Sequence, residues 1–436
     1  MTAHSNYREL FDAAAQRPSA KDFLPQLKIA AIEQFEAVGF PTTRDEDWHF
    51  TSVSPIAERI FRPVRATATT LTAEDIARFT YGQDDWHLLV FVNGRYEPAL
   101  SSFAELDVDA QVMTFGEALK EAPELLAERL GTLAPKAHAF TALNTAFMAD
   151  GVVIRVPKDV VLDTPVHVVY VTDSHANGAS LHPRTLVIAE RGAQLTLVET
   201  FATIGGGAYF TNHVAEVVVG ENARVDHYKV QREGGEAFHV GTIQATQDRN
   251  SIYHAFSFAV GAQLSRTNVF SKLVGEGCEV RLNGLYALEE AQHADHQTFV
   301  EHIAPSCSSR EVYKGILDGT SHGVFNGKVY VHPEAQKTDG KQTNKALLLS
   351  EGARVDSKPQ LEIFADDVKC THGATVGQLD DMALFYMKSR GIGADRSRAL
   401  LTYAFAAEVL ELIELEPLKV ALEALLFERF IPPDTV

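Results

Sequence analysis

One short stretch combines two residue types that suit a soft metal centre. It reads LEIFADDVKCTHGATVG over residues 361–377, and its pattern predicts a strand at 361–364, a turn, and a second strand at 368–372. Side chains alternate faces along a strand, so Cys370 and His372 should point the same way, about 6.6–6.8 Å apart. At this spacing a thiolate and an imidazole can reach one small metal cluster, but not the direct hydrogen bond of a Cys–His protease pair. Alternatively, Cys370 packs as a small hydrophobe and His372 is structural.

A second group of histidines is a weaker candidate for metal binding. The segment QHADHQTFVEH contains His293, His296 and His302, and a His-x2-His spacing is compatible with a metal site. On a strand, however, His293 and His296 fall on opposite faces. The alternative is that all three histidines are ordinary lining residues of a β-structure.

Motifs for nucleotide binding and for common hydrolytic chemistry are missing. The glycines at 205–207 are not followed by Gly-Lys-Ser/Thr, so no P-loop is present and no bound nucleotide is expected. No Gly-x-Ser-x-Gly elbow occurs. Adjacent aspartates such as Asp366-Asp367 and Asp380-Asp381 fall at predicted turns or helix starts, where they cap. The sequence thus gives no positive sign of an enzyme.

Composition limits the partners that the chain can bind. Its 436 residues include 39 Lys and Arg against 58 Asp and Glu, a formal net charge of −19. That charge argues against binding to nucleic acid or to an anionic membrane surface. The three cysteines include no Cys-x-x-Cys pair, which argues against a disulfide scaffold or a zinc knuckle. We find neither a secretory signal nor a run of about 20 apolar residues, and we expect a cytoplasmic protein.

Hydrophobic periodicity divides the chain into three regions. Residues 1–85 read as an N-terminal helical domain, residues 86–376 as a β-rich core with a helical insertion at about 115–148, and residues 377–436 as a C-terminal helical domain. Asn93-Gly94 predicts a tight hairpin. In the C-terminal region helices are predicted at 379–390 and 395–415, with Pro417 opening a third.

The β-rich core contains a recurring phrase, in which a turn with Gly or Asn is followed by a small residue and a new strand. It occurs at Gly192-Ala193, Asn222-Ala223, Gly261-Ala262, Gly277-Cys278 and Gly352-Ala353. The spacing is irregular, yet the recurrence favours a stacked solenoid such as a β-helix. A β-sandwich or barrel with ordinary glycine turns is the alternative.

Several longer phrases together resemble the SufB/SufD family of iron–sulfur cluster assembly proteins. They are REVYKGILDG (310–319), VFNGKVYVHPEAQKTDGKQTNKALLLS (324–350), KPQLEIFADDVKCTHGATVGQLD (358–380) and LFYMKSRGI (384–392), supported by FPTTRDEDWHF near the N-terminus. The phrase CTHGATVG resembles the SufD branch, because SufB members carry a Glu where this chain has Gly373.

This resemblance implies a mainly β fold, with a right-handed parallel β-helix between N- and C-terminal α-helical domains. It implies a scaffold subunit that pairs with SufB through the β-helix edge and receives the ATPase SufC on its C-terminal helices. The residues that it assigns to SufC binding are Leu384, Phe385, Arg390, Gly391, Ile392 and Tyr403.

The resemblance also implies a shared site for the nascent cluster at the SufB interface. There His372 would be an iron or cluster ligand and Cys370 a neighbouring thiol, holding a transient iron–sulfur cluster or iron. Reduced flavin is implied only for the whole complex, and a homodimer is expected to be an option when SufB is absent. Two other functions stay open at this point: a β-helix enzyme acting on polysaccharide, with a Ca²⁺-binding carboxylate cluster and an Arg or Lys base, and an inert structural scaffold.

Overall fold

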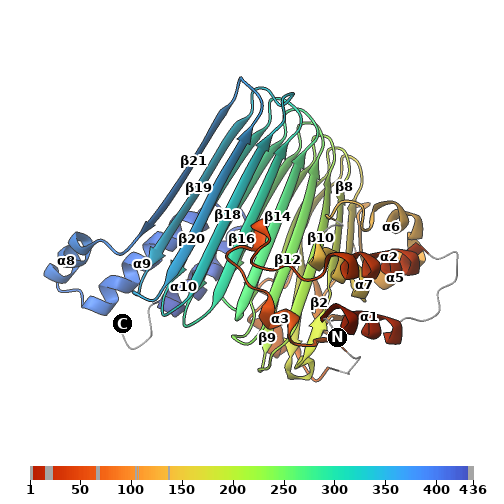
Figure 1. The fold of residues 1–436 in the computed structure, drawn as a ribbon, viewed down its shortest axis with the longest axis horizontal. Coiled ribbons are helices and arrows are strands. Elements are labelled where there is room, and N and C mark those ends of the chain that lie inside the picture. Colours follow the sequence, from red (N-terminus) through yellow and green to blue (C-terminus); the bar gives the residue numbers. More distant parts are fainter. Residues whose placement is uncertain are drawn as a thin grey trace.

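Two parallel β-sheets face each other along a solenoid, with helices at both ends of the chain (Figure 1). The computed structural model describes residues 3–14, 23–64, 69–103, 106, 108–135 and 138–430. Each coil contributes one strand to each sheet, and successive coils stack in parallel register. The predicted mainly β solenoid flanked by helices is therefore confirmed, and the sandwich or barrel alternative is wrong.

Sheet A and sheet B are named here by their strands. Sheet A runs in the order β20 (Arg354–Ile363), β18 (His322–Val331), β16 (His293–His302), β14 (Leu264–Leu273), β12 (Phe238–Gln247), β10 (Phe210–Val219), β8 (Arg184–Ala189), β5 (Gly151–Val156) and β4 (Gln111–Thr114), with β7 (Ala179–Leu181) and β1 (Arg62–Pro63) beside it. Sheet B runs in the order β21 (Lys369–Gly377), β19 (Asp339–Leu348), β17 (Ser308–Leu317), β15 (Glu279–Leu288), β13 (Ile252–Ala259), β11 (Arg224–Arg232), β9 (Gln194–Ile204), β6 (Val161–Asp173), β2 (His87–Val92) and β3 (Arg95–Tyr96).

A large apolar cluster runs through the space between the sheets, beside several buried polar side chains. Inward side chains from both sheets, such as Val217, Ile243, Leu195 and Val225, belong to one buried cluster. Because many strands are also covered on their outer faces, they are buried on both sides and read as near-continuous apolar runs.

The corner that leads into sheet B is marked by one left-handed residue in each coil. Positive φ angles occur at Gly192, Asn222, Asn250, Gly277, Ser306 and Lys337, and these positions lie 27 to 31 residues apart. At Gly277 the conformation and the close stacking both favour glycine, because a Cβ there would lie 2.5 Å from the side-chain oxygen of Asn250. The corner repeat thus sets the length of a coil.

The N-terminal third covers the first coils. The helices are α1 (Ala3–Ala14), α2 (Phe23–Val38), α3 (Ser54–Ala57), α4 (Ala73–Ala77), α5 (Phe115–Glu121), α6 (Pro123–Arg129) and α7 (Ala139–Phe147), with short 3₁₀ turns η1 (Glu46–Trp48), η2 (Pro98–Leu100) and η3 (Ser174–Ala176). Side chains of α1, α2 and α7 pack with Phe210 and Phe238 on the outer face of sheet A. The predicted hairpin is present, since Asn93 and Gly94 have positive φ and join β2 to β3.

Three helices follow the last strand: α8 (Asp381–Ser389), α9 (Ala394–Leu410) and α10 (Glu416–Phe430). Asp380 caps α8, and Gly391 after its end has a φ of 84°. The predicted helix over 395–415 ends earlier, at Leu410, because the chain turns at 411–415 where Glu414 bonds to sheet B. Helices α9 and α10 bury Val409, Leu418 and other side chains against the outer face of sheet B.

No helix of the described residues is long and apolar enough to cross a membrane.

Candidate functional site

The last coil leaves both sheets with an open edge. Within the part of the chain that the structure describes, β21 pairs only with β19 in sheet B, and β20 pairs only with β18 in sheet A. Most of β21 is exposed, including Val376, and so is Phe364 just after β20. Such an edge presents unpaired backbone N–H and C=O groups to another strand.

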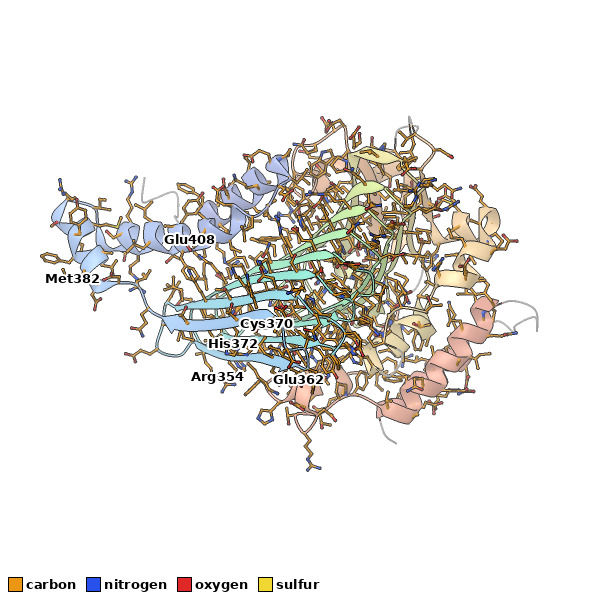
Figure 2. The ribbon with its side chains drawn as sticks, turned by 90° about the horizontal axis from the view of Figure 1, so that it is seen from above. Arg354, Glu362, Cys370, His372, Met382 and Glu408 are labelled. Atoms are coloured by element: carbon orange, nitrogen blue, oxygen red, sulfur yellow. The ribbon has the colours of Figure 1, made fainter. Side chains whose placement is uncertain are left out.

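Cys370 and His372 both lie on β21, as predicted (Figure 2). The strand is longer than predicted, since its register with β19 continues from Lys369 to Gly377. Cys370 is half-buried and packs beside the apolar cluster that includes Val329 and Ala335. Burial raises the pKa of the Cys370 thiol, so at neutral pH it needs a cation or metal to become a thiolate ligand.

His372 is exposed and stands at the end of a polar column. It is paired in register with Gln342, which is paired with Glu311 one coil further in. Gln342 donates its amide to the Glu311 carboxyl at 3.4 Å, and Thr298 donates to the same oxygen at 2.5 Å. Burial raises the pKa of Glu311 to about 7. The imidazole therefore lies over an interior acid that is two coils away.

The three histidines of β16 do not converge on one site. His293 lies on the outer face, where its Nε2 is 2.9 Å from the Thr51 hydroxyl and its ring contacts His322. His296 points inward and stacks on Tyr286. His302 also points inward, with its Nε2 3.0 Å from the hydroxyl of Ser309.

Of these histidines, His302 is the one that approaches the stacked residues Ser309, Gly340 and Cys370. Gly340 lies between Ser309 and Cys370, and a Cβ placed on it would be 3.4 Å from the Ser309 hydroxyl and 3.3 Å from the Cys370 sulfur. The glycine therefore leaves the space beneath Cys370 narrow and free of a side chain.

The C-terminal residues assigned to partner binding separate into two groups. On α8, Phe385 is 67% exposed, and its neighbours Met382 and Tyr386 are similarly exposed. Leu384 and Ile392 are half-buried, whereas Arg390 and Gly391 are exposed at the end of α8. Tyr403, on α9, is half-buried and contacts Phe427 at 6.0 Å between ring centroids. Helix α8 thus carries an uncovered apolar face, and Tyr403 belongs to the packing of α9 on α10.

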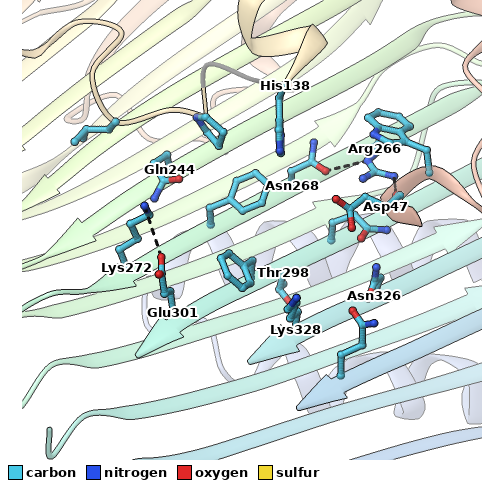
Figure 3. A pocket seen from close by; sticks show the side chains of 17 residues that line it. Asp47, His138, Gln244, Arg266, Asn268, Lys272, Thr298, Glu301, Asn326 and Lys328 are labelled. Atoms are coloured by element: carbon cyan, nitrogen blue, oxygen red, sulfur yellow. Dashed lines mark hydrogen bonds and ion pairs between the residues drawn. The ribbon is translucent and has the colours of Figure 1, made fainter. Parts of the chain in front are cut away.

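A cavity of about 380 Å³ lies elsewhere, between the N-terminal segment and the outer face of sheet A (Figure 3). Phe270 and Phe299 line it, and the Arg266 guanidinium lies 3.6 Å from the centre of the Trp48 ring at its edge. Lys272 and Glu301, register partners on β14 and β16, form an ion pair at 3.6 Å on the sheet that forms one wall of the cavity. Neither Cys370 nor His372 lines this cavity, so it is separate from the predicted site.

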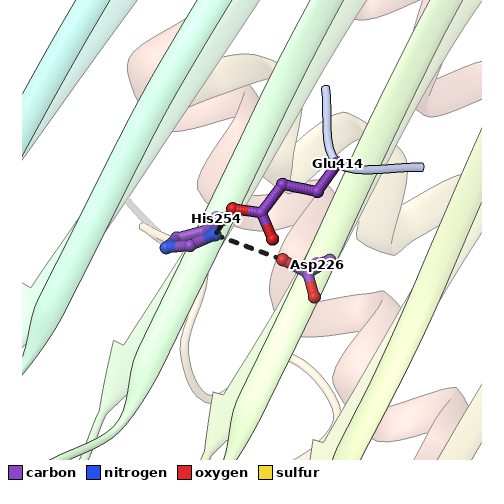
Figure 4. A group of neighbouring side chains, drawn as sticks. All are labelled: Asp226, His254 and Glu414. Carbon is purple, nitrogen blue, oxygen red and sulfur yellow. Dashed lines mark ion pairs between the residues drawn. The ribbon is translucent and has the colours of Figure 1, made fainter. Parts of the chain in front are cut away.

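Among the described residues, one group has the spacing to hold a metal ion: Asp226, His254 and Glu414 (Figure 4). The His254 Nδ1 is 3.2 Å from Asp226 and 3.6 Å from Glu414. Arg224 forms ion pairs with both carboxylates, and Arg281 forms a further one with Glu414 at 3.4 Å.

The arginines decide the role of this group. A cation-dependent polysaccharide enzyme would need free carboxylates for Ca²⁺, whereas here guanidinium groups already neutralise them. Glu414 lies in the turn between α9 and α10, and its partners lie on sheet B. The group therefore anchors the C-terminal helices.

The interior holds buried ionisable groups that sequence reasoning missed. Glu199 lies 3.1 Å from His213 and 2.8 Å from His227, and all three are buried. Burial alone would raise the pKa of Glu199, but the two histidines hold it well below its ordinary value. Strand alternation was the available signal, yet charged residues on a strand are usually assigned to the solvent face.

Comparisons with known proteins agree with this architecture. A family model described as the SufBD protein N-terminal region matches residues 1–168, and one described as SUF system FeS cluster assembly, SufBD core domain, matches residues 170–405. An iron–sulfur cluster assembly SufBD family protein of Synechocystis is 33% identical over 93% of this chain and 88% of its own length. The iron–sulfur cluster assembly protein SufD of Escherichia coli is 30% identical over 96% of this chain and 94% of its own, and SufD of Bacillus subtilis is 27% identical over 96% of each. This chain belongs to the SufBD family of iron–sulfur cluster assembly proteins.

Proposed function

We propose that the protein is a non-catalytic, SufD-type scaffold subunit whose last coil pairs with SufB and completes a cluster site. The observation that carries this proposal is the open edge of β21, which holds Cys370 and His372. An unpaired, exposed strand is suited to pair with the edge strand of another protein through main-chain hydrogen bonds. We expect the complex in the cytoplasm, where thiols stay reduced.

In this proposal His372 is an iron or cluster ligand and Cys370 is the neighbouring thiol. Imidazole and thiolate are both ligands of iron–sulfur centres. The other two cysteines, Cys278 and Cys307, are buried and cannot join them, so this chain has too few thiols for a four-cysteine site. SufB must therefore supply the remaining ligands of the transient cluster. Reduced flavin, if the complex uses it, has no assigned residues on this chain.

The exposed apolar face of α8 is the proposed contact for the ATPase SufC. Met382, Phe385 and Tyr386 of α8 are large, exposed side chains. Helix α8 lies at the far end of the molecule from α1 and α2 (Figure 1). Leu384 and Ile392 are half-buried, and Arg390 and Gly391 end the helix. Hydrophobic side chains at such exposure are typical of residues that a partner covers.

The cluster-site proposal is tested by His372→Ala in complex with SufB and SufC, using anaerobic reconstitution with iron and sulfide and visible absorption. We expect the cluster yield to fall at least several-fold while co-purification with SufB is retained. Thr371→Ala is the matched control, because Thr371 is exposed on the same strand but alternates to the other face. A normal assembly rate in His372→Ala would disprove the ligand role and leave an inert scaffold as the remaining function.

The SufC proposal is tested by Phe385→Asp, with Lys388→Asp on the same helix as the control for added charge. We expect Phe385→Asp to lose SufC from the purified complex and Lys388→Asp to retain it. Deleting the C-terminal helices would be a poorer test, because α9 and α10 cover apolar side chains of sheet B. Retention of SufC by Phe385→Asp at unchanged stability would disprove the proposed contact.

The same open edge explains why a homodimer is expected without SufB. Two copies would then pair through β21, and SufB would displace one of them. Light scattering of the protein alone and with an equimolar amount of SufB tests this point. A monomer at high concentration would show that the edge needs side-chain contacts that only SufB provides.

A further inference from the structure

The corner before sheet B carries a ladder of small, buried side chains, one from each coil. Its members, each buried and each immediately before a strand of sheet B, are Ala193, Ala223, Ser251, Cys278, Cys307 and Thr338. The two cysteines are consecutive members of this ladder, because Glu279 and Ser308, which follow them, are partners in the register of β15 and β17. The Ser308 N–H donates to the Cys278 carbonyl at 2.8 Å.

The two thiols point at the same backbone oxygen. The sulfur of Cys278 lies 3.1 Å from the Gly275 carbonyl oxygen, and the sulfur of Cys307 lies 3.3 Å from it. Neighbouring strands are about 4.7–4.9 Å apart, which falls inside the range of about 4.4–6.8 Å that a disulfide needs between Cα atoms. Val274 and Glu276, the chain neighbours of Gly275, are exposed, so the carbonyl that both thiols approach lies in a surface turn.

We propose that Cys278 and Cys307 form a reversible oxidation site, in which a peroxide converts the two thiols into a disulfide between adjacent coils. Cys370 is excluded from this pair, since it lies on β21, two coils further along sheet B from β17.

The reaction balances with hydrogen peroxide as the oxidant. The Cys278 thiolate attacks one peroxide oxygen, the O–O bond breaks, and hydroxide leaves and takes up a proton as water. The Cys307 sulfur then attacks the resulting sulfenic sulfur, a second water leaves, and the S–S bond forms. Two thiols lose two electrons, and one peroxide becomes two waters. The hydrogen bond with Cys307 lowers the pKa of Cys278 below its ordinary value, which favours Cys278 as the attacking thiolate.

The arrangement has a protective consequence. A sulfenic acid without a nearby thiol proceeds to irreversible sulfinic acid, whereas a neighbouring thiol captures it as a disulfide. The bond would join two coils in the middle of the solenoid, so oxidation would hold the stack together.

The test treats the purified, full-length protein with hydrogen peroxide, removes the excess, and counts thiols after unfolding in N-ethylmaleimide. We expect labelled cysteines to fall from three to one, an intact mass lower by two hydrogen atoms, and a cross-linked peptide containing Cys278 and Cys307. The melting temperature should rise by about 3 °C, and a reductant should reverse all of these changes.

Two substitutions make the outcome specific. Cys307→Ser should abolish the cross-link, and it should fold, because Ser251 occupies the same place in the ladder two coils earlier. Cys370→Ser should keep the cross-link. Three labelled thiols after treatment of the folded protein, or a disulfide that requires Cys370, would overturn the proposal.

Discussion

The inner coils and the last coil share one repeat, but their polar side chains differ in burial and in bonding. In the inner coils, Glu199, His213 and His227 are buried and bonded to one another. In the last coil, His372 is exposed on a strand with a single neighbour. Glu199 thus finds its ion-pair partners within the chain, whereas His372 remains accessible to a partner molecule.

This difference separates the buried histidines of the interior from the exposed histidine that we propose as a ligand. A buried polar group must be paired within the chain, because leaving it unpaired is costly. At the open edge water satisfies the same groups at little cost, and a partner can replace that water. Substitutions in the two regions should therefore differ strongly in their effect on stability.

The largest effect is expected where an inner ion pair is broken. Glu216 and Arg184 are fully buried, 2.5 Å apart, and Glu216 also accepts the N–H groups of Gly131 and Leu133. Glu216→Ala leaves a buried guanidinium without its counter-ion and should lower the free energy of unfolding by about 3–5 kcal/mol, measured by chemical denaturation. The exposed Glu276→Ala is the control, and an equal loss in both would contradict the contrast between the regions.

Substitution of Glu311, the interior acid beneath His372, should stabilise the protein instead of destabilising it, and the size of this effect should depend on pH. Burial raises the pKa of Glu311 from 4.5 to about 7, so its stabilising contribution is complete below pH 4.5 and is lost as the pH rises through 7. Glu311→Gln keeps the neutral shape without titrating.

We therefore expect Glu311→Gln to gain stability relative to the parent protein, by roughly 3 kcal/mol between pH 4.5 and 8. Paired denaturation curves at these two pH values measure this gain. A difference between the two proteins that is independent of pH would show that Glu311 does not change protonation on folding.

A smaller effect is expected at the anchor of the C-terminal helices. Glu414 is partly exposed and bonds Arg224 and Arg281. Glu414→Gln should cost up to about 1 kcal/mol, with faster hydrogen exchange confined to the turn and to the adjoining ends of α9 and α10. Glu428→Gln, exposed on α10, should leave exchange unchanged. Faster exchange across the solenoid would mean that the anchor supports the whole fold.

The smallest effect on stability is expected at the edge itself. His372→Ala should change the free energy of unfolding by no more than about 0.5 kcal/mol, because the side chain is exposed and buries little. Thermal melting of the uncomplexed protein measures it. A loss comparable to that of Glu216→Ala would make His372 a structural residue and remove the distinction.

The solenoid was predictable from the corner phrases, but the length of its repeat was not. Gly192, Asn222 and Gly277 belong to one corner, whereas Gly261 and Gly352 precede strands of sheet A at another. The missing members of the first corner are Asn250, Ser306 and Lys337, and serine and lysine seldom adopt positive φ. The recurring phrases combined two different corners and omitted three members of the first one. The repeat of about thirty residues was therefore not apparent from the sequence.

Only the contribution of residues close together in the sequence to the candidate site was predictable. Strand alternation alone places Cys370 and His372 on one face, since they are two residues apart. The column through Gln342 to Glu311 joins residues about thirty positions apart, and it depends on the register between coils. No local pattern in the sequence encodes that register.

Helix α8 is tied to the rest of the molecule at both of its ends. Three residues separate it from β21, and four separate it from α9. An extended chain spans at most about 3.3–3.6 Å per residue, so the short link limits how far α8 can move before it pulls on the last strand. On the other side, Lys314 of β17 holds α9 through the Phe405 carbonyl at 2.7 Å and Glu408 at 2.5 Å. A partner that binds α8 and displaces it would therefore pull on the last strand and on β17 at the same time.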